Sequence, residues 1–493
     1  MLRNKEDRGN EISAAAVQGS RRRGIYFALA ALLLGGCTVG PKYVRPPVEV
    51  PATYKDSGEW KLAQPSDAVA KGSWWEVYQD PELNSLEDQV TSSNQNLKAA
   101  AAQFAAARAA VRVSRSNYFP VVTANPSATR IHQSSNRPLF NTATGTTDYS
   151  DYVLPFDASY EADVWGSVRR SVEASRSEAQ ASAADLASVS LSMHAELALD
   201  YFELRGLDAK KALLDSTVES YQKALELTQN RYQGGLASAV EVAQAQTQLE
   251  TTRAQATDVE VSRAAYQNAI AALIGKPASS FLLAPLPLTT APPAIPPGLP
   301  SDLLERRPDI AAAERRVQEA NAQIGVAKAA YFPLITLSGS GGFESAALST
   351  LIQGPSGLWS LGAAGAQTLF DAGRRKGTLQ EAMAAHDQSV AVYRQTVLSA
   401  FQDVEDNLAA LRILRDESTT EDAAVDAARH SLALSTTRYR GGVTSYLEVT
   451  TAQSAALSNE VTAVDLLTRR MAASVLLVKA LGGGWNVSQI PHT

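Results

Sequence analysis

The chain has 493 residues, of which 45% are hydrophobic and 19% are charged, and its formal net charge is -6 at pH 7. This length exceeds one ordinary hydrophobic core and predicts two or three domain-sized units. The acidic balance, together with the lack of an aromatic stretch interleaved with Lys and Arg, argues against nucleic acid as a partner.

The first residues have the pattern of an export signal. Arg21, Arg22 and Arg23 precede the apolar run 25–34. A positive region followed by a short apolar run is typical of a secretory signal peptide, whereas a transmembrane helix needs about 20 apolar residues. We therefore expect residues 1–36 to be a signal peptide and the mature chain to be exported.

Cys37 is the only cysteine, so an intramolecular disulfide is impossible. It follows Leu34-Gly35-Gly36, and small residues before a thiol at the membrane surface resemble a lipid-attachment signal. The alternative is an incidental cysteine at the end of an ordinary signal peptide. We expect Cys37 to be the lipid-attachment residue, and residues 37–80 to form a lipid-anchored, extended N-terminal segment. Thr38, rather than Asp, follows the cysteine, and resemblance to lipoprotein sorting signals implies that the lipid contacted is outer-membrane lipid.

The chain contains an internal repeat. The motif Arg231-Tyr232-Gln233-Gly234-Gly235 recurs as Arg438-Tyr439-Arg440-Gly441-Gly442, at an offset of 207 residues (438 minus 231). Tyr118-Phe119-Pro120 likewise recurs as Tyr331-Phe332-Pro333. The sequence therefore predicts a duplicated unit of roughly 200 residues, far longer than the repeats of solenoid proteins.

Proline placement predicts very long helices. The chain has 22 prolines, yet none lies in 156–276 or 356–490, and a proline inside a helix costs about 3 kcal/mol. A helix over 167–231 would be about 98 Å long at ~1.5 Å per residue, too long for a compact domain. We expect the first repeat to cover 81–276 and the second 301–481.

The elements are predicted in the following chain order. They are helix 81–117, a β-hairpin at about 119–165, long helix 167–231, helix 238–274, a Pro-rich strap at 277–300, helix 301–331, a β-hairpin at about 332–370, long helix 371–440, helix 445–481 and a C-terminal equatorial tail at 482–493. In each repeat the two shorter helices, stacked end to end, match the height of the long helix. The breaks, beginning at Asp80-Pro81, are expected to form a belt at mid-height.

The two Gly-Gly motifs are predicted helix reversals. Glycine suits the left-handed residue that ends a helix, and Ser238-x-x-Glu241 and Ser445-x-x-Glu448 match the capping box that begins the next one. We expect two exposed tips that dock a partner. The candidate docking residues are Arg231, Tyr232, Gly234, Gly235, Arg438, Tyr439, Gly441 and Gly442. The alternative is that these arginines and tyrosines serve only their own helix ends, where a cation favours the helix dipole.

Each repeat offers one antiparallel β-hairpin, which gives four strands per chain. Four strands cannot cross a bilayer alone, because their open edges would leave backbone groups unpaired in hydrocarbon. Bacterial barrels have at least eight strands. Eight would enclose too narrow a channel, so three copies supplying twelve strands are the expected assembly.

Catalytic and metal-binding patterns are missing from the sequence. The five histidines are scattered, and none lies at metal-ligand spacing from another His or from Cys37. Neither a nucleophile elbow nor a phosphate-binding loop occurs. We expect no enzyme activity, no cofactor and no metal, so any energy for transport must come from a partner.

Several motifs resemble the outer-membrane factor family, the TolC-like tunnels, in its NodT-type lipoprotein branch. The resemblance covers almost the whole mature chain. It is carried by Val39-Gly40-Pro41-Lys42-Tyr43, Trp74-Trp75, Tyr160-Glu161-x-Asp163-x-Trp165-Gly166, Arg306-Arg307-Pro308-Asp309, Phe370-Asp371-x-Gly373-Arg374-Arg375 and Leu481-Gly482-Gly483-Gly484-Trp485.

The resemblance implies a mostly α fold with a small β part. Long helical hairpins would form a trimeric α-barrel, and four strands per protomer would contribute to a 12-stranded transmembrane β-barrel. It implies a homotrimer that binds a periplasmic adaptor (membrane fusion) protein and an inner-membrane pump, most often of the RND type.

By position in the family, Leu447 and Thr451 would line the periplasmic gate. Thr451 stands where relatives often carry Asp, which puts an acidic ring in doubt. The implied function is a passive exit duct for small molecules across the outer membrane. Export of proteins and a non-conducting periplasmic structural lipoprotein are the alternatives.

Overall fold

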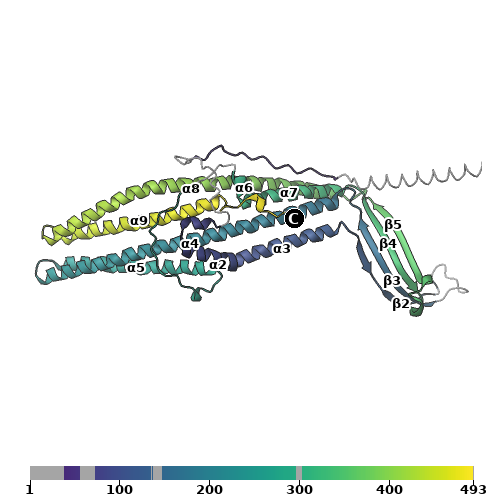
Figure 1. Ribbon diagram of the computed structural model, residues 1–493, viewed down its shortest axis with the longest axis horizontal. Helices are drawn as coiled ribbons and strands as arrows, with labels where there is room; N and C mark the ends of the chain where they lie inside the picture. Colours follow the sequence, from purple (N-terminus) through teal and green to yellow (C-terminus); the bar gives the residue numbers. More distant parts are fainter. Residues whose placement is uncertain (1–37, 56–72, 135, 137–146, 296–301, 492–493) are drawn as a thin grey trace, which may run out of the picture.

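The computed structural model describes residues 38–55, 73–134, 136, 147–295 and 302–491. The predicted signal peptide and Cys37 lie outside the described residues. The molecule is elongated, with helices along its length, a sheet bent away at one end and two helical hairpin tips at the other (Figure 1).

The helices repeat in length as well as in sequence. In each repeat, helices of 22, 67 and 35 residues follow one another in that order. In the first repeat these are α3 (Gln95–Ser116), α4 (Ser167–Gln233) and α5 (Ala239–Leu273), and in the second α7 (Pro308–Ala329), α8 (Arg374–Arg440) and α9 (Tyr446–Ala480). The shorter α2 (Pro81–Ser93) and α6 (Leu303–Arg306) precede α3 and α7, and the 3-10 turn η1 (Trp74–Tyr78) precedes α2.

The long helices form one curved row. Helix α4 packs against α3 and α7 toward the sheet and against α5 and α9 toward the tips, while α8 packs against α7 and α9. The row therefore reads α3–α4–α7–α8 near the sheet and α5–α4–α9–α8 near the tips (Figure 1). Its two edges are α8 on one side and α3 with α5 on the other.

The prediction of one helix over 81–117 was wrong, because Asn94 divides it. The Asn94 side chain accepts a hydrogen bond from Leu97 N–H at 3.0 Å and so caps α3, while its amide donates to the Leu273 carbonyl at 2.8 Å. Thus α3 alone stacks on the end of α5. Asp80 caps α2 as expected, but α2 lies beside α4, outside the stacked track. The prediction of one helix over 301–331 was also wrong, because Arg307 is extended before Pro308 and separates α6 from α7. At this matching joint Arg307 donates to the Ala480 carbonyl at 3.2 Å.

The sheet is one antiparallel ribbon that joins the repeats. Its strands are β1 (Val121–Ala124), β2 (Ser127–His132), β3 (Asp148–Glu161), β4 (Leu334–Ser345) and β5 (Gly357–Ala366), in the spatial order β1/β2–β3–β4–β5. Segments β1 and β2 pair with β3 in one continuous register, so they are one strand interrupted at Asn125-Pro126, where proline has no N–H to donate. The predicted four strands are present within the two predicted hairpin regions.

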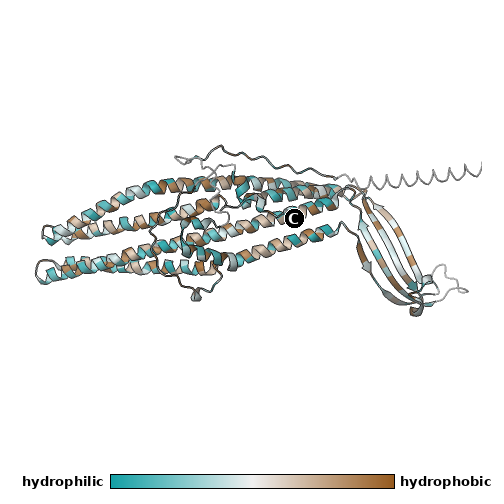
Figure 2. Ribbon diagram, viewed as in Figure 1, coloured by the Kyte–Doolittle hydropathy of each residue, from teal (hydrophilic) through white to brown (hydrophobic). Residues whose placement is uncertain are grey.

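The main core lies midway along the helices. It gathers the 3-10 turn, α2 and the middle of α4, α8 and α9 around fully buried side chains such as Leu83, Tyr201, Ile310 and Tyr393. The mostly α fold with a small antiparallel sheet is thereby confirmed. Among the described residues, no helix combines the length and apolarity needed to cross a membrane, and polar and apolar residues alternate along each long helix (Figure 2).

Candidate functional site

Both hairpin tips end in the same backbone turn. In the first tip, Leu236 N–H donates to the Arg231 carbonyl at 2.8 Å and Gly235 N–H to the Tyr232 carbonyl at 3.0 Å. These two bonds define a Schellman motif, which needs a left-handed residue after the helix end. Gly235 supplies it with φ 71°.

The second tip repeats this geometry with near-identical distances. Val443 N–H donates to the Arg438 carbonyl at 3.0 Å, Gly442 N–H donates to the Tyr439 carbonyl at 2.9 Å, and Gly442 has φ 73°. The left-handed residue is the second glycine of each pair, since Gly234 and Gly441 have negative φ.

The capping boxes differ between the tips. The Ser238 hydroxyl accepts from Glu241 N–H at 3.3 Å, which is the serine half of the predicted capping box, while the Glu241 carboxylate accepts from Tyr439. The prediction for Ser445 was wrong: within the described tip its side chain makes no capping hydrogen bond. Glu448 lies 3.6 Å from Arg438 across the turn. The spacing of residues therefore does not by itself produce a cap.

An asymmetric clasp holds the two tips together. The Arg231 guanidinium lies over the Tyr439 ring, 4.8 Å from its centre, and donates to the Arg440 carbonyl at 3.2 Å. The Tyr439 hydroxyl donates to Glu241 at 3.0 Å. Two residues of the first hairpin thus grip one tyrosine of the second. We name Arg231, Glu241 and Tyr439 the tip clasp.

A small apolar cluster lies behind the tip clasp. Tyr439 meets Tyr446 edge to face with ring centres 5.2 Å apart, and the Tyr221 hydroxyl donates to the Gln453 carbonyl at 3.1 Å. Burial raises the pKa of Tyr439 and raises that of Tyr446 to about 12, so both stay neutral and can donate hydrogen bonds at any physiological pH. The cluster joins α4 and α5 to α9.

The predicted docking residues fall into two groups. Tyr439 is only 3% exposed, which removes it from the surface of this chain, whereas Tyr232 is 50% exposed. A Cβ atom added at Gly235 or Gly442 would meet nothing within 4 Å, so both turns are open. Arg438 lies on the surface beside Glu448. Arg231 is part of the tip clasp, with its guanidinium turned toward Tyr439.

The predicted gate residues lie on the first turns of α9. Leu447 is 58% exposed, and the exposed Thr451 hydroxyl donates to the Leu447 carbonyl at 2.9 Å. Leu236, Val240 and Val443 are also exposed apolar side chains near the tips. Sequence reasoning missed these three, although the repeat offset pairs Leu236 with Val443 and Val240 with Leu447.

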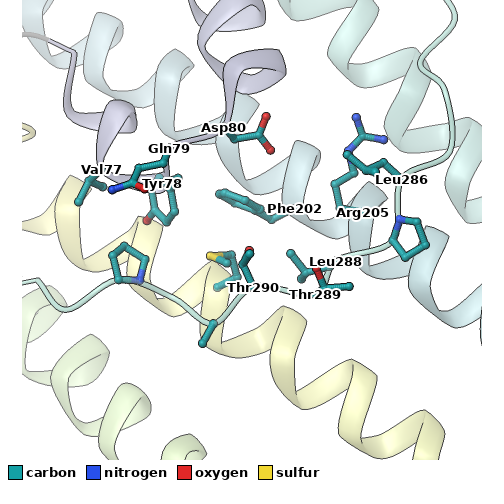
Figure 3. A pocket seen from close by; sticks show the side chains of 14 residues that line it. Val77, Tyr78, Gln79, Asp80, Phe202, Arg205, Leu286, Leu288, Thr289 and Thr290 are labelled. Carbon is teal, nitrogen blue, oxygen red and sulfur yellow. The ribbon is translucent and has the colours of Figure 1, made fainter.

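A cavity of about 410 Å³ lies at mid-length between the 3-10 turn, α4 and the linker after α5 (Figure 3). Asp80 accepts from the Tyr201 hydroxyl at 2.6 Å, and Arg205 donates to the Ala284 carbonyl of the linker at 2.7 Å. Asp208 then accepts from Arg263 at 2.6 Å. These hydrogen bonds and ion pairs fasten the linker after α5 to α4 along the cavity.

A buried carboxyl–imidazole pair fastens α2 to α4. Glu87 and His194 are 2.6 Å apart, and Trp75 stacks on the imidazole with ring centres 4.5 Å apart. Burial raises the pKa of Glu87 to about 9 and lowers that of His194 to about 4. Burial thus disfavours the charged form of each group.

The part of the chain that the structure describes holds no group of three or more His, Cys, Asp or Glu side chains suited to a metal ion. The organised features are instead the two tips, the fastened linker at mid-length and the ribbon of strands. Each is a joint between long elements.

Comparison with known proteins identifies the family. The model of the outer membrane efflux protein family matches residues 86–276 and 299–483. The toluene efflux pump outer membrane protein TtgC of Pseudomonas putida is 32% identical over 461 residues, which are 93% of this chain and 95% of that protein. Outer membrane protein OprJ of Pseudomonas aeruginosa is 32% identical over 467 residues, 94% and 96% of the two chains.

A solved structure of the outer-membrane channel OprN superposes with a TM-score of 0.85 at 30% identity, and covers 91% of this chain and 100% of that one. The duplicated hairpins, the four-stranded ribbon and the paired tips therefore have counterparts in known channels. The chain belongs to the outer membrane efflux protein family and is an outer-membrane channel component of an efflux system.

Proposed function

We propose that three copies of this chain form a passive duct through which an efflux system discharges small molecules across the outer membrane. The observation that supports the proposal is that both the sheet and the helical row of one chain end in unpaired edges. The ribbon ends in β1/β2 on one side and β5 on the other, and the helical row ends in α8 and in α3 with α5. Backbone groups at a strand edge must be paired inside a bilayer. Three ribbons close into twelve strands and three rows into a matching helical tunnel.

The junction between helices and strands would lie at the inner surface of the outer membrane. Phe119, Leu369 and Phe370 are 70%, 91% and 87% exposed there, and aromatic side chains collect at membrane surfaces. The described chain begins next to this junction, where Val39 N–H donates to the Trp165 carbonyl at 3.1 Å. A lipid on Cys37 would therefore enter the neighbouring leaflet, and Cys37→Ser would abolish acylation as read by mass spectrometry.

The opposite end would face the periplasm and dock the adaptor protein of a tripartite system. The residues available for this are Tyr232, Arg438, and the open turns of Gly235 and Gly442. An inner-membrane pump, of the RND type, would supply the energy, and this chain would work without catalysis or a cofactor. Replacing Gly441 and Gly442 by bulky residues should weaken adaptor binding without unfolding the distant sheet.

The tips would also hold the periplasmic gate. The exposed Leu447 and Thr451 on α9 would line a ring when three copies meet, and the tip clasp holds α8 of the second hairpin against α4 and α5 of the first. Because Thr451 has no charge, this ring would narrow the duct sterically and would not bind cations at that level. Opening would require the second hairpin to move away from the first, which means breaking the tip clasp.

Single-channel recording in planar bilayers tests the proposal. Purified wild-type protein should give small or rare conductance steps, and Tyr439→Ala should raise the conductance because it removes the centre of the tip clasp. Tyr232→Ala, an exposed tyrosine at the equivalent repeat position, is the matched control and should behave as wild type. If neither protein conducts, the chain is a periplasmic strut and the duct proposal is wrong.

A further inference from the structure

Residues 38–55 run along the molecule beside α7 and α8, from the junction with the sheet to mid-length (Figure 1). We call them the N-terminal segment. At mid-length, Lys55 N–H donates to Glu405 at 2.9 Å and Tyr54 is buried. At the junction the segment makes many more contacts with the helices, through the motif 39–43 that also carries the resemblance.

A buried arginine holds the beginning of the segment. Arg170 of α4 is 7% exposed. Its guanidinium donates to the Val39 carbonyl at 3.4 Å, to the Pro41 carbonyl at 3.0 Å and to Glu173 at 2.8 Å. Two of these three bonds thus go to backbone carbonyls of the segment, and the planar guanidinium fork suits such a pair of acceptors. Glu173 balances the buried charge.

The surface under the segment is shaped to let the two backbones touch. Gly40 has φ 112°, and a Cβ added there would lie 2.6 Å from Gly325 Cα. A Cβ on Gly325 would in turn lie 2.8 Å from the Arg170 side chain. Beside them, the Asn321 amide donates to the Pro41 carbonyl at 3.2 Å. Glycine is therefore required on both sides of the contact.

Further contacts extend the hold toward mid-length. The Tyr43 hydroxyl donates to Glu314 at 3.0 Å, and Arg45 lies 3.4 Å from the other oxygen of the same carboxylate. Arg45 also donates to the Tyr393 hydroxyl at 3.3 Å. The segment is bound by side chains of α4, α7 and α8, as a peptide is bound in a groove.

We call Arg170, Asn321 and Gly325, which hold the beginning of the N-terminal segment, the seat. The seat lies close to the junction between helices and strands, where aromatic side chains are exposed. Val39 is bonded to the carbonyl of Trp165, and the Trp165 indole stacks on Phe332 with ring centres 4.8 Å apart and donates to the Pro333 carbonyl at 2.8 Å. Thr38, the first residue that the structure describes, lies against Gly166, where an added Cβ would meet the Thr38 side chain at 2.9 Å. The described segment therefore starts next to Trp165 and Phe332.

We propose that Arg170, Asn321 and Gly325 are positioning residues that seat the N-terminal segment, fix the height at which its acyl group leaves the protein, and direct that group into the membrane leaflet beside Phe332. The partner of this surface is the lipid bilayer, reached through the acyl chain. The inference rests on the lipid attachment proposed above. A single acyl chain binds a membrane only weakly, so a seat that removes the freedom of the tether makes each chain more effective.

Trypsin cleavage of the Lys42–Tyr43 bond tests the seat. Lys42 is exposed, but a protease needs several residues of extended, released chain, so the cleavage rate follows the released population. The full acylated protein is reconstituted in phosphatidylethanolamine–phosphatidylglycerol vesicles, and new chains beginning at Tyr43 are counted by mass spectrometry. Arg170→Met and Gly40→Ala should each speed this cleavage about ten-fold or more, which corresponds to about 1.4 kcal/mol lost from seating.

Two controls separate a local effect from general unfolding. Arg176→Met removes an exposed arginine of the same helix and should cleave as wild type does. Cleavage after Arg440, at the distant second tip, should be the same in all variants, and Arg170→Lys, which keeps the charge but has no planar fork, should restore only part of the protection. Equal cleavage at Lys42 in wild type, Arg170→Met and Gly40→Ala would overturn the proposal.

A second readout separates failure of the seat from failure of lipid attachment. In Val44→Cys, acylation of Cys37 leaves one free thiol, whereas an unacylated chain has two, so thiol titration reports the lipid independently. A nitroxide on Cys at position 44 should be restricted in the seated protein and mobile with Arg170→Met. One free thiol together with a mobile label, in otherwise wild-type protein, would contradict the seat but not the lipid attachment. Two free thiols together with a restricted label would contradict the lipid attachment, and with it the placement of the acyl group.

Discussion

The two hairpin tips share a backbone but not a role. Both end in the same Schellman turn, with the left-handed glycine at Gly235 or Gly442. Yet Tyr439 is buried while its repeat partner Tyr232 is half exposed. The duplication preserved the turn, because the turn depends on local backbone geometry. The contacts around it diverged, because the first hairpin grips the second and the reverse does not occur.

The first hairpin supplies the side chains that hold the two tips together. Arg231 and Glu241 belong to the first repeat and contact Tyr439. Their counterparts in the second repeat, Arg438 and Glu448, form an ion pair with each other at the surface, with 3.6 Å between the charged atoms. Arg231 and Glu241 of the first hairpin therefore hold the second hairpin in place. The equivalent residues Arg438 and Glu448 lie at the surface, where an adaptor protein could contact them. The following substitutions test this asymmetry pair by pair.

The largest effect is expected at the buried tyrosine. Tyr439→Ala removes a buried ring and should lower the free energy of opening of the tip by about 3 kcal/mol, in the range known for deleting buried aromatic side chains. Tyr232→Ala should stay within about 0.5 kcal/mol, as for an exposed side chain. Native-state hydrogen exchange of the first turns of α9 measures both, and equal effects would contradict the asymmetry.

The two arginines should differ next. Arg231→Ala removes a stacked cation and a charged hydrogen bond, with an expected cost of about 2 kcal/mol. Arg438→Ala breaks an exposed ion pair of the kind that contributes about 0.5 kcal/mol or less. A double-mutant cycle between Arg231 and Tyr439 should show coupling, and a cycle that gives additive costs would exclude the stacking contact.

Substitution of the left-handed glycine should have the same effect at both tips, because the two turns have the same backbone geometry. Gly235→Ala and Gly442→Ala each force a side chain into a left-handed conformation, at a cost of about 1–2 kcal/mol. Neither added Cβ meets another atom, so backbone strain is the whole effect. Cleavage by trypsin after Arg231 and Arg440 should rise by similar factors, and a rise at only one tip would show that the turns are not equivalent.

The smallest difference is expected at the two serines. Ser238→Ala removes a working cap and should cost about 1 kcal/mol, whereas Ser445→Ala should cost at most a few tenths. Hydrogen exchange of Glu241 N–H and Glu448 N–H resolves the two. Comparable acceleration at both amides would mean that Ser445 also caps its helix.

Regular features of the fold could be predicted from the sequence. Proline placement and the repeated Arg-Tyr-x-Gly-Gly motif were enough for the long helices, the reversals and the pair of tips, because these depend on local propensity. The division at Asn94 was missed, since a helix with a capping asparagine in its middle looks like a longer helix until Leu273 is known to face it.

Contacts between distant segments could not be predicted. Tyr439 was assigned to the surface because a tyrosine near a helix end has no sequence mark that distinguishes packing from docking. The contacts of Arg170 were also beyond prediction, since they join residues more than a hundred positions apart. The structure gives no reason for the missing cap at Ser445. Patterns in a single sequence indicate local structure, but they do not indicate which distant side chains are in contact.

We propose that one chain supplies a third of a tunnel. Electron cryomicroscopy of the full protein in lipid nanodiscs measures this directly by counting copies around the axis and locating the edges of each helical row. The account predicts three copies, with α8 of one chain against α3 and α5 of the next and a closed ring of twelve strands. A different number of copies, or chains whose ribbon edges remain unpaired in the bilayer, would contradict it.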